Sequence, residues 1–276
     1  MVRVDRWRIW GAVLGLIVAV LAGCAGEKDT RTVEERRRAS ARATAEALKE
    51  IRTRWMREGT YLAGDEALQN KIKTAVDNFG KLTNYHIGLY TQTPMSLAEM
   101  DGRINGTDCE FYFREGGRGD FQTFLVIDDR FYLQEGRVLA DYGTGTAGKG
   151  HKRYIPKIQE MRFYIRQALK NEIKILGEDT FQGMKVQQYD LRTTLPGSVG
   201  EEERVLTVVV DIEPERNVLV HAQIGIGTGS QSADARYVYQ YAEMMITKIG
   251  EVGDIVLPEK AEVVPKESAY EEYILR

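Results

Sequence analysis

The side chains best suited to covalent chemistry in this sequence are its two cysteines. Cys24 closely follows an uncharged run that begins at Ile9, and Cys109 lies beside Phe111 and Phe113 in an alternating run. A thiol among apolar residues is more often a core residue than a reactive one, so we expect Cys109 to be buried. Cys24 stands where a signal segment would end, which makes its thiol the candidate for modification.

The segment before Cys24 has the organisation of an export signal. Three arginines among the first eight residues precede the uncharged run Ile9–Leu21, whose 13 residues fall short of the roughly 20 that a spanning helix needs. The run ends in Leu21-Ala22-Gly23-Cys24, which resembles the lipobox of bacterial lipoproteins. The resemblance implies cleavage before Cys24, a lipid on its thiol and a cell-membrane location on the extracytoplasmic side. Two or more acyl chains make such an anchor durable. The alternative is an ordinary secretory signal, or an uncleaved anchor, with a chance cysteine.

Length and charge bound the rest of the chain. Removal of residues 1–23 leaves 253 residues with a net charge of −5, which is enough for one large domain and does not suggest nucleic-acid binding. Residues 24–58 predict a lipidated cysteine followed by a charged, partly helical tether, because residues 25–58 hold ten basic and seven acidic side chains without a proline. We assign residues 59–265 to the folded domain and 266–276 to a tail.

Two stretches have the apolar spacing of helices. Asp65 is a suitable N-cap for a helix to about Phe79, and Gly80 suits its end. Tyr154–Lys170 predicts a second helix, with a proline in its first turn.

Elsewhere the apolar period is two, which predicts strands joined by short turns. Asp128-Asp129 indicates a hairpin turn, and Glu178–Gly183 another. In Asn217–Gly227 the pattern places Val218, Val220, Ala222, Ile224 and Ile226 on one face. His86 and His221 fall on the opposite phase to their apolar neighbours, which predicts a wet sheet face for both. The fold class is therefore α+β, a mostly antiparallel sheet with helices against one face.

Three segments resemble those of the lipoprotein-carrier (LolA/LppX-like) superfamily. Glu172–Leu191 is similar to its hairpin with Gly-Glu and Gly-X-Lys, Val208–Gln223 to its "hydrophobic-Asp, turn, return strand" hairpin, and Tyr241–Ala261 to its ending with Leu-Pro-Glu. The resemblance implies a strongly curved, unclosed half-barrel sheet with helices on its concave side. It also implies an apolar cavity between them, which receives acyl chains in several members. Leu97–Gly106 and Gly143–Gly150 have no counterpart in that group.

Other chemistry finds little support. Gly143–Gly150 almost matches a phosphate-binding loop, but Gly150 stands where Ser or Thr must hold magnesium, so we interpret it as a surface loop. The three histidines, at 86, 151 and 221, have no second His or Cys at ligand spacing, so no metal site is expected. His151 lies in a basic cluster that could meet an anionic headgroup. No catalytic motif is present, and we expect neither an enzyme nor a cofactor.

The favoured hypothesis is a membrane-anchored envelope lipoprotein that binds or carries an acyl-chain ligand, such as a lipid, glycolipid or lipoprotein. Its candidate cavity walls are the alternating strand faces and the two helical stripes, at Val205, Val209, Val218, Val220, Ile224, Ile226, Leu68, Ile72, Ile158, Met161 and Ile165. The alternative is an envelope interaction or sensor protein with a filled core, binding another protein through the strip Tyr237-Tyr239-Tyr241.

Overall fold

The computed structural model describes residues 61–63, 65–93, 96–115, 122–195, 204–228 and 238–266. All of them belong to one compact unit, Glu58–Arg276. The predicted signal, Cys24, the tether and the tail beyond Lys266 lie outside the described residues, so these remain predictions. Among the described helices, none combines the length and the apolar character that crossing a membrane requires.

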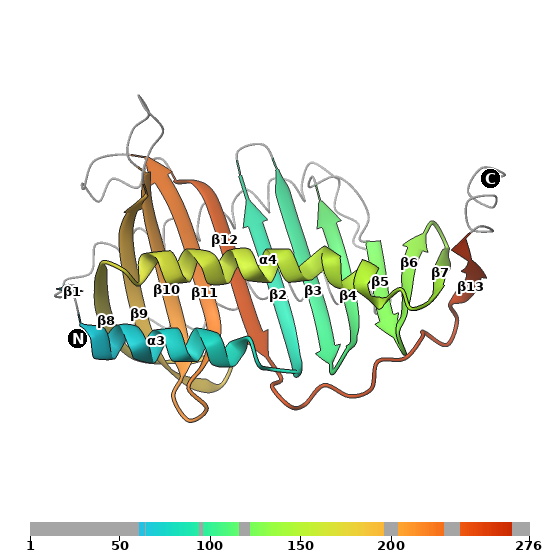
Figure 1. Cartoon of the computed structure of the whole chain (residues 1–276), viewed down its shortest axis with the longest axis horizontal. Coiled ribbons are helices and arrows are strands. Elements are labelled where there is room, and N and C mark those ends of the chain that lie inside the picture. Colours follow the sequence, from blue (N-terminus) through green and yellow to red (C-terminus); the bar gives the residue numbers. More distant parts are fainter. Residues whose placement is uncertain are drawn as a thin grey trace, which may run out of the picture. The chain divides into compact units, whose positions relative to one another are not determined.

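The described strands form one sheet, and two helices lie across it (Figure 1). The helices are α3 (Glu66–Phe79) and α4 (Ala147–Ala168). The strands are β1 (Tyr61–Ala63), β2 (Asn84–Gln92), β3 (Leu97–Asn105), β4 (Asp108–Glu115), β5 (Gln122–Ile127), β6 (Arg130–Glu135), β7 (Val138–Thr144), β8 (Glu172–Phe181), β9 (Met184–Leu195), β10 (Arg204–Glu213), β11 (Val218–Thr228), β12 (Val238–Thr247) and β13 (Glu262–Pro265).

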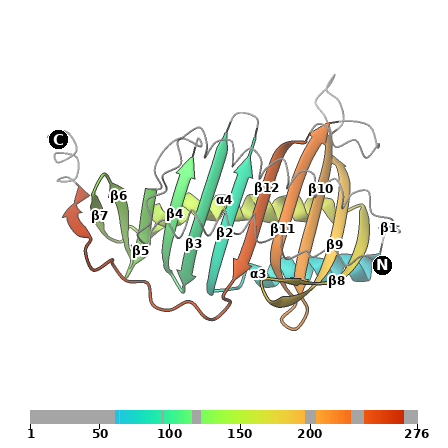
Figure 2. The ribbon, with the colours of Figure 1, turned by 180° about the vertical axis from the view of Figure 1, so that it is seen from behind.

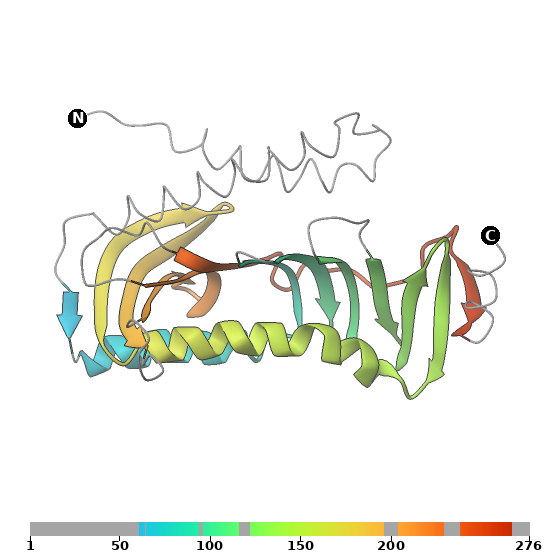
Figure 3. The ribbon, with the colours of Figure 1, turned by 90° about the horizontal axis from the view of Figure 1, so that it is seen from above.

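The strand order is β1-β8-β9-β10-β11-β12-β2-β3-β4-β5-β6-β7-β13. Every described pair is antiparallel except β13 with β7, which run parallel. The sheet is unclosed, with β1 at one edge and β13 at the other, and it curls strongly at the β8–β9 end (Figure 3). Both helices lie on the same face, as the view from behind also shows (Figure 2). The predicted fold class, a curved antiparallel sheet with helices on one side, is confirmed.

Helix α3 begins and ends where its sequence predicts. The Asp65 carboxylate accepts a hydrogen bond from the Leu68 amide at 2.9 Å, and Gly80 follows the last residue, Phe79. The buried residues of α3 form one stripe: Leu68, Ile72, Ala75, Val76 and Phe79. An N-cap of this kind contributes about 1 kcal/mol, and the stripe fixes which side of the helix meets the sheet.

Helix α4 begins seven residues earlier than the apolar spacing predicts, at Ala147 instead of Tyr154. The surface-loop interpretation of Gly143–Gly150 is therefore wrong for its second half. Gly143, near the end of β7, and Gly145, directly after it, have φ values of 84° and 77°, a conformation that glycine adopts without strain. At Gly150 a Cβ would stand 2.4 Å from Cγ2 of Val126, so this glycine lets α4 approach the sheet.

The Asp128-Asp129 hairpin turn is confirmed between β5 and β6. Both aspartates have positive φ, 49° and 61°, as a type I′ turn requires. The second turn is narrower than predicted, because β8 continues to Phe181 and only Gln182 and Gly183 turn the chain.

The main core fills the space between the helices and the inner face of the sheet, which we define as the face that they cover. A β-bulge where Asp211 and Ile212 of β10 meet β11 changes the phase of β11. Leu219, Ala222, Ile224 and Ile226 belong to this core, whereas Val218 and Val220 are buried outside it. The prediction that all five alternating residues of β11 share a face is thus wrong at its first two members, since a bulge adds one residue and reverses the alternation.

Candidate functional site

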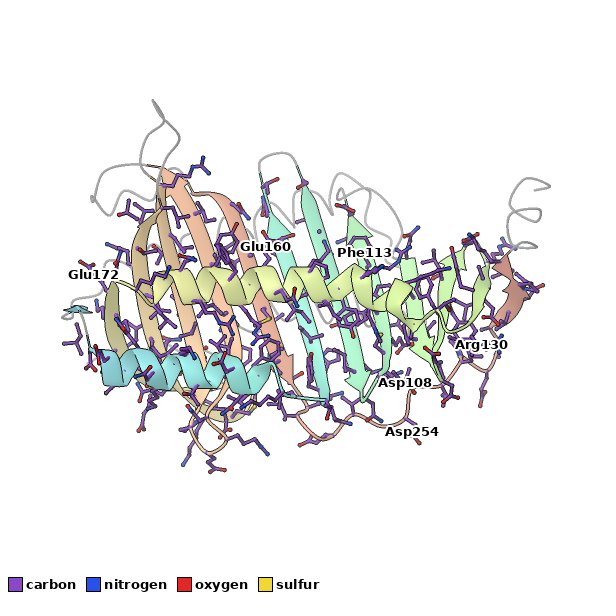
Figure 4. The ribbon with its side chains drawn as sticks, in the orientation of Figure 1. Asp108, Phe113, Arg130, Glu160, Glu172 and Asp254 are labelled. Carbon is purple, nitrogen blue, oxygen red and sulfur yellow. The ribbon has the colours of Figure 1, made fainter. Side chains whose placement is uncertain are left out.

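The packing on the inner face is interrupted by a cavity of about 190 Å³ between α4 and the middle of the sheet. Its strands are β12, β2, β3 and β4, which are neighbours in the sheet although β12 lies far from the other three along the chain. Its lining residues are Leu89, Thr91, Thr93, Ala98, Glu99, Met100, Phe113, Lys157, Glu160, Met161, Tyr164, Gln240 and Ala242. Phe113 at the upper part of β4 and Glu160 on α4 mark its position in Figure 4.

The lining is apolar at one end and polar at the other. Leu89, Met100, Met161 and Ala242 are buried members of the core. The polar lining residues lie near the end of β2, near the starts of β3 and β12, and on α4: Thr91, Thr93, Glu99, Gln240, Lys157 and Glu160. An apolar interior with a few polar groups is the usual composition of a site for a small hydrophobic ligand.

The cavity lies between two parts of the core that are filled. Towards β11, the space under the sheet is occupied by the buried stripe of α3. Towards β5 and β6, aromatic rings fill it: Phe111 stacks on Tyr154 with centroids 4.4 Å apart and on Phe124 at 5.1 Å. In between, alanines at positions 98 and 242 line the space, and a small side chain on a pleated face leaves volume that its neighbours do not reach.

Of the wall residues predicted from sequence, Met161 alone lines this cavity. The other predicted wall residues are buried outside the cavity lining, except Val205, which is half-buried on β10. Leu68, Ile72, Ile158, Ile165, Ile224 and Ile226 belong to the main core. Val209, Val218 and Val220 are buried but lie outside that core. The sequence pattern identified part of the apolar inner face, but the open space lies on β12, β2, β3 and β4, where Ala98 and Ala242 are among the lining residues.

Cys109 is fully buried, as expected. Burial raises the pKa of its thiol to about 12, so this cysteine stays protonated and unreactive at physiological pH. His151, by contrast, lies near the surface, where its Nε2 is 3.0 Å from the carbonyl oxygen of Thr107 and its ring meets the edge of Tyr154.

The outer face of the sheet holds a buried ionic cluster that sequence reasoning missed. His221 is 0% exposed and lies between two carboxylates, with Nδ1 2.9 Å from Asp211 and Nε2 2.9 Å from Glu243. Gln188 donates to Asp211, and the Tyr241 hydroxyl donates to Glu243. The prediction of a wet environment for His221 is therefore wrong. The apolar alternation correctly placed His221 on the sheet face opposite the main core. The imidazole is nevertheless buried on that face, and the Phe181 ring stacks on it with ring centroids 4.5 Å apart.

The two carboxylates keep the imidazole of His221 charged. Burial alone would lower its pKa, but hydrogen bonds and charge interactions with Asp211 and Glu243 raise the pKa to about 9. For Glu243, burial acts to raise the pKa, while the hydrogen bond from His221 and its charge lower it overall. At neutral pH the cluster is thus an imidazolium held by two carboxylates, a structural clasp across β10, β11 and β12.

The tyrosine strip proposed as a protein interface is not an exposed patch at Tyr241, which is buried and bonded to Glu243. Tyr237 and the side chain of Tyr239 lie outside the described residues. Within the described ranges, no group of three or more His, Cys, Asp or Glu side chains has the arrangement of a metal site.

Comparison with known proteins gives matches among solved structures alone. No family model matches the chain, and none of the curated proteins matches it. The solved structures include lipoprotein LppX of Mycobacterium tuberculosis (16% identity, 70% of this chain and 100% of that chain, TM-score 0.43). They also include LprF of Mycobacterium bovis (13% identity, 72% of this chain and 100% of that chain, TM-score 0.44). A third is a DUF1329 family protein of Desulfovibrio piger (8% identity, 70% of this chain and 95% of that chain, TM-score 0.19).

Proposed function

We propose that this protein is a lipid-anchored envelope lipoprotein that binds an acyl chain, or a similar apolar group, between α4 and the sheet. The observation that carries the proposal is the cavity under α4, which has a buried apolar end and a polar rim. Burial of apolar surface contributes roughly 25 cal/mol per Å², so a chain inserted there needs few polar anchors. The lipobox-like sequence at Cys24 supports a position at a membrane, where such ligands are found.

The size of the cavity limits what it holds in this conformation. Its volume of about 190 Å³ is below the roughly 300–1,000 Å³ of pockets that take drug-sized ligands. It therefore accommodates part of a chain, and a complete lipid requires α4 to separate further from β12, β2 and β3. Met161, at the contact between α4 and this part of the sheet, is an unbranched side chain that adapts readily to such a change.

Native mass spectrometry of residues 59–276, purified gently from a bacterial host, tests the proposal. We expect an additional bound mass that survives desalting and is released as lipid on denaturation. A clean unliganded mass, together with no uptake of fluorescent acyl probes, would contradict it. That outcome would favour the alternative, an envelope interaction or sensor protein whose core beneath α3 and around Phe111 is already filled.

A further inference from the structure

The segment around α4 carries a charge opposite in sign to that of the rest of the chain. Residues 147–170 hold seven basic side chains and one acidic side chain, a net charge of +6. The whole chain has a net charge of −3, so the other residues together carry −9. A concentration of one sign on a single element indicates a partner of the opposite sign.

Part of this charge serves the fold. Arg166 donates to Asp77 of α3 at 2.6 Å, and Arg162 lies 3.8 Å from the same carboxylate, so these two arginines connect the helices. Lys157 lies over the ring of Phe113 at 5.1 Å, beside the cavity. Lys152 and Lys170, by contrast, are exposed to solvent.

Large apolar side chains accompany these lysines at the surface. Phe163 is 54% exposed and Ile155 38% exposed, although both belong to α4. Phe163 follows Lys152 by 11 residues and precedes Lys170 by seven, which are about three and two helical turns, so the three residues share the outward side of the segment. The sheet covers the opposite side of α4, as Figure 3 shows. An exposed aromatic ring between basic residues on a helix is typical of a surface that lies in a membrane interface.

We infer that the outward face of α4 docks on an anionic membrane surface, with Phe163 in the boundary between headgroups and acyl chains. Lys152 and Lys170 then pair with lipid phosphates. Phe163 and Ile155 favour a lipid surface over a nucleic acid, since exposed aliphatic and aromatic groups find apolar surroundings in a bilayer. This docking does not depend on an occupied cavity. It does place Lys157 and Glu160, at the cavity's polar rim, beside the membrane from which an apolar ligand would come.

Spin labels on the full chain, as a bacterial host processes it and after reconstitution in vesicles, test the docking. One label replaces Phe163 (Phe163→Cys), and a control label replaces Val256 (Val256→Cys). Val256 is 65% exposed and precedes Leu257, which packs against the cluster of Leu125, Tyr132 and Leu139, outside the main core. Buried Cys109 contributes little background, and the chain without an introduced cysteine measures what remains. Accessibility to oxygen and to a water-soluble nickel complex reports the depth of each label.

With vesicles rich in phosphatidylglycerol, the label at 163 should become accessible to oxygen and protected from nickel, while the label at 256 stays in water. Pure phosphatidylcholine or high salt should remove the protection.

Replacing two lysines, Lys152→Glu with Lys170→Glu, should weaken docking roughly thirtyfold or more, at about 1 kcal/mol per basic residue. The matched control Lys185→Glu with Lys260→Glu makes the same charge change elsewhere and should leave docking intact. Equal nickel accessibility at 163 and 256 on anionic vesicles, or equal losses from both double variants, would overturn the inference.

Discussion

The clasp formed by His221 makes the stability of the fold depend on pH in a direction that the structure specifies. The pKa of His221 is about 9 in the folded protein, against about 6.5 for an unperturbed histidine. Because the folded pKa is the higher one, protonation favours folding. The contribution is complete below about pH 6.5 and is lost as the pH rises through about 9. Linkage gives about 3 kcal/mol at pH 6, about 2 kcal/mol at pH 7.5 and almost nothing at pH 9.5.

Urea unfolding of residues 59–276 at these three pH values measures the effect. Two other buried groups, Tyr85 and Cys109, do not interfere, because burial raises the pKa of each to about 12, above this window. In Glu243→Gln, one of the two anionic partners of His221 is replaced by a neutral side chain of the same shape. In this variant the loss of stability with rising pH should be smaller and should occur at a pH closer to neutral. The reason is that a single carboxylate, Asp211, then stabilises the charged imidazole.

His86→Gln is the matched control. His86 is partly exposed and pairs with one carboxylate, Asp101, at 3.1 Å, where solvent screens the interaction. This variant should keep the pH dependence of the parent chain. An unfolding free energy that is constant or rises between pH 6 and pH 9.5 would refute the proposed charge state of His221.

Three substitutions test the packing around α4 and α3. Gly150→Ala should destabilise the fold by about 1–3 kcal/mol in urea unfolding, because its Cβ would stand 2.4 Å from Val126; an unchanged midpoint would contradict the close approach. Asp65→Ala should lower stability by about 1 kcal/mol through loss of the bond to the Leu68 amide, and no change would show that this cap is dispensable. Met161→Ala should cost about 2–5 kcal/mol while strengthening the binding of bulkier acyl probes, since it enlarges the cavity; weaker binding of every probe would count against the site.

Local signals in the sequence predicted local structure well. The Asp128-Asp129 pair predicts a hairpin turn because few other residue types accept two successive positive φ angles, and the structure has both. Asp65 and Gly80 bound α3 for similarly local reasons. The first turns of α4 escaped prediction, since three glycines between positions 143 and 148 favour a loop and the packing of Gly150 against Val126 is a long-range contact.

The site depends on contacts that no single segment of sequence reveals. The bulge between β10 and β11 reversed the phase of Val218 and Val220. The clasp joins His221 to Glu243, which lies 22 residues further along the chain. Only the register of the strands shows that these two residues are neighbours. The cavity, likewise, arises where Ala98 and Ala242 lie on separate strands beneath α4. Apolar residues that repeat every two positions in a strand, or every 3.6 positions in a helix, show which face of the element is apolar. Packing against the other elements decides where such a face is left open.

Ala242→Leu tests whether an apolar ligand binds in the cavity under α4, because Ala242 lines that cavity. The added carbons would occupy the cavity, and binding of a fluorescent fatty acid should weaken about tenfold or more, because a ligand and the new side chain cannot share the space. Stability should hold or rise by up to about 2 kcal/mol through the added buried groups. The same substitution at exposed Ala67 on α3 is the control and should bind as the parent chain does. Equal probe affinity in Ala242→Leu and the parent chain would place the ligand elsewhere and contradict binding under α4.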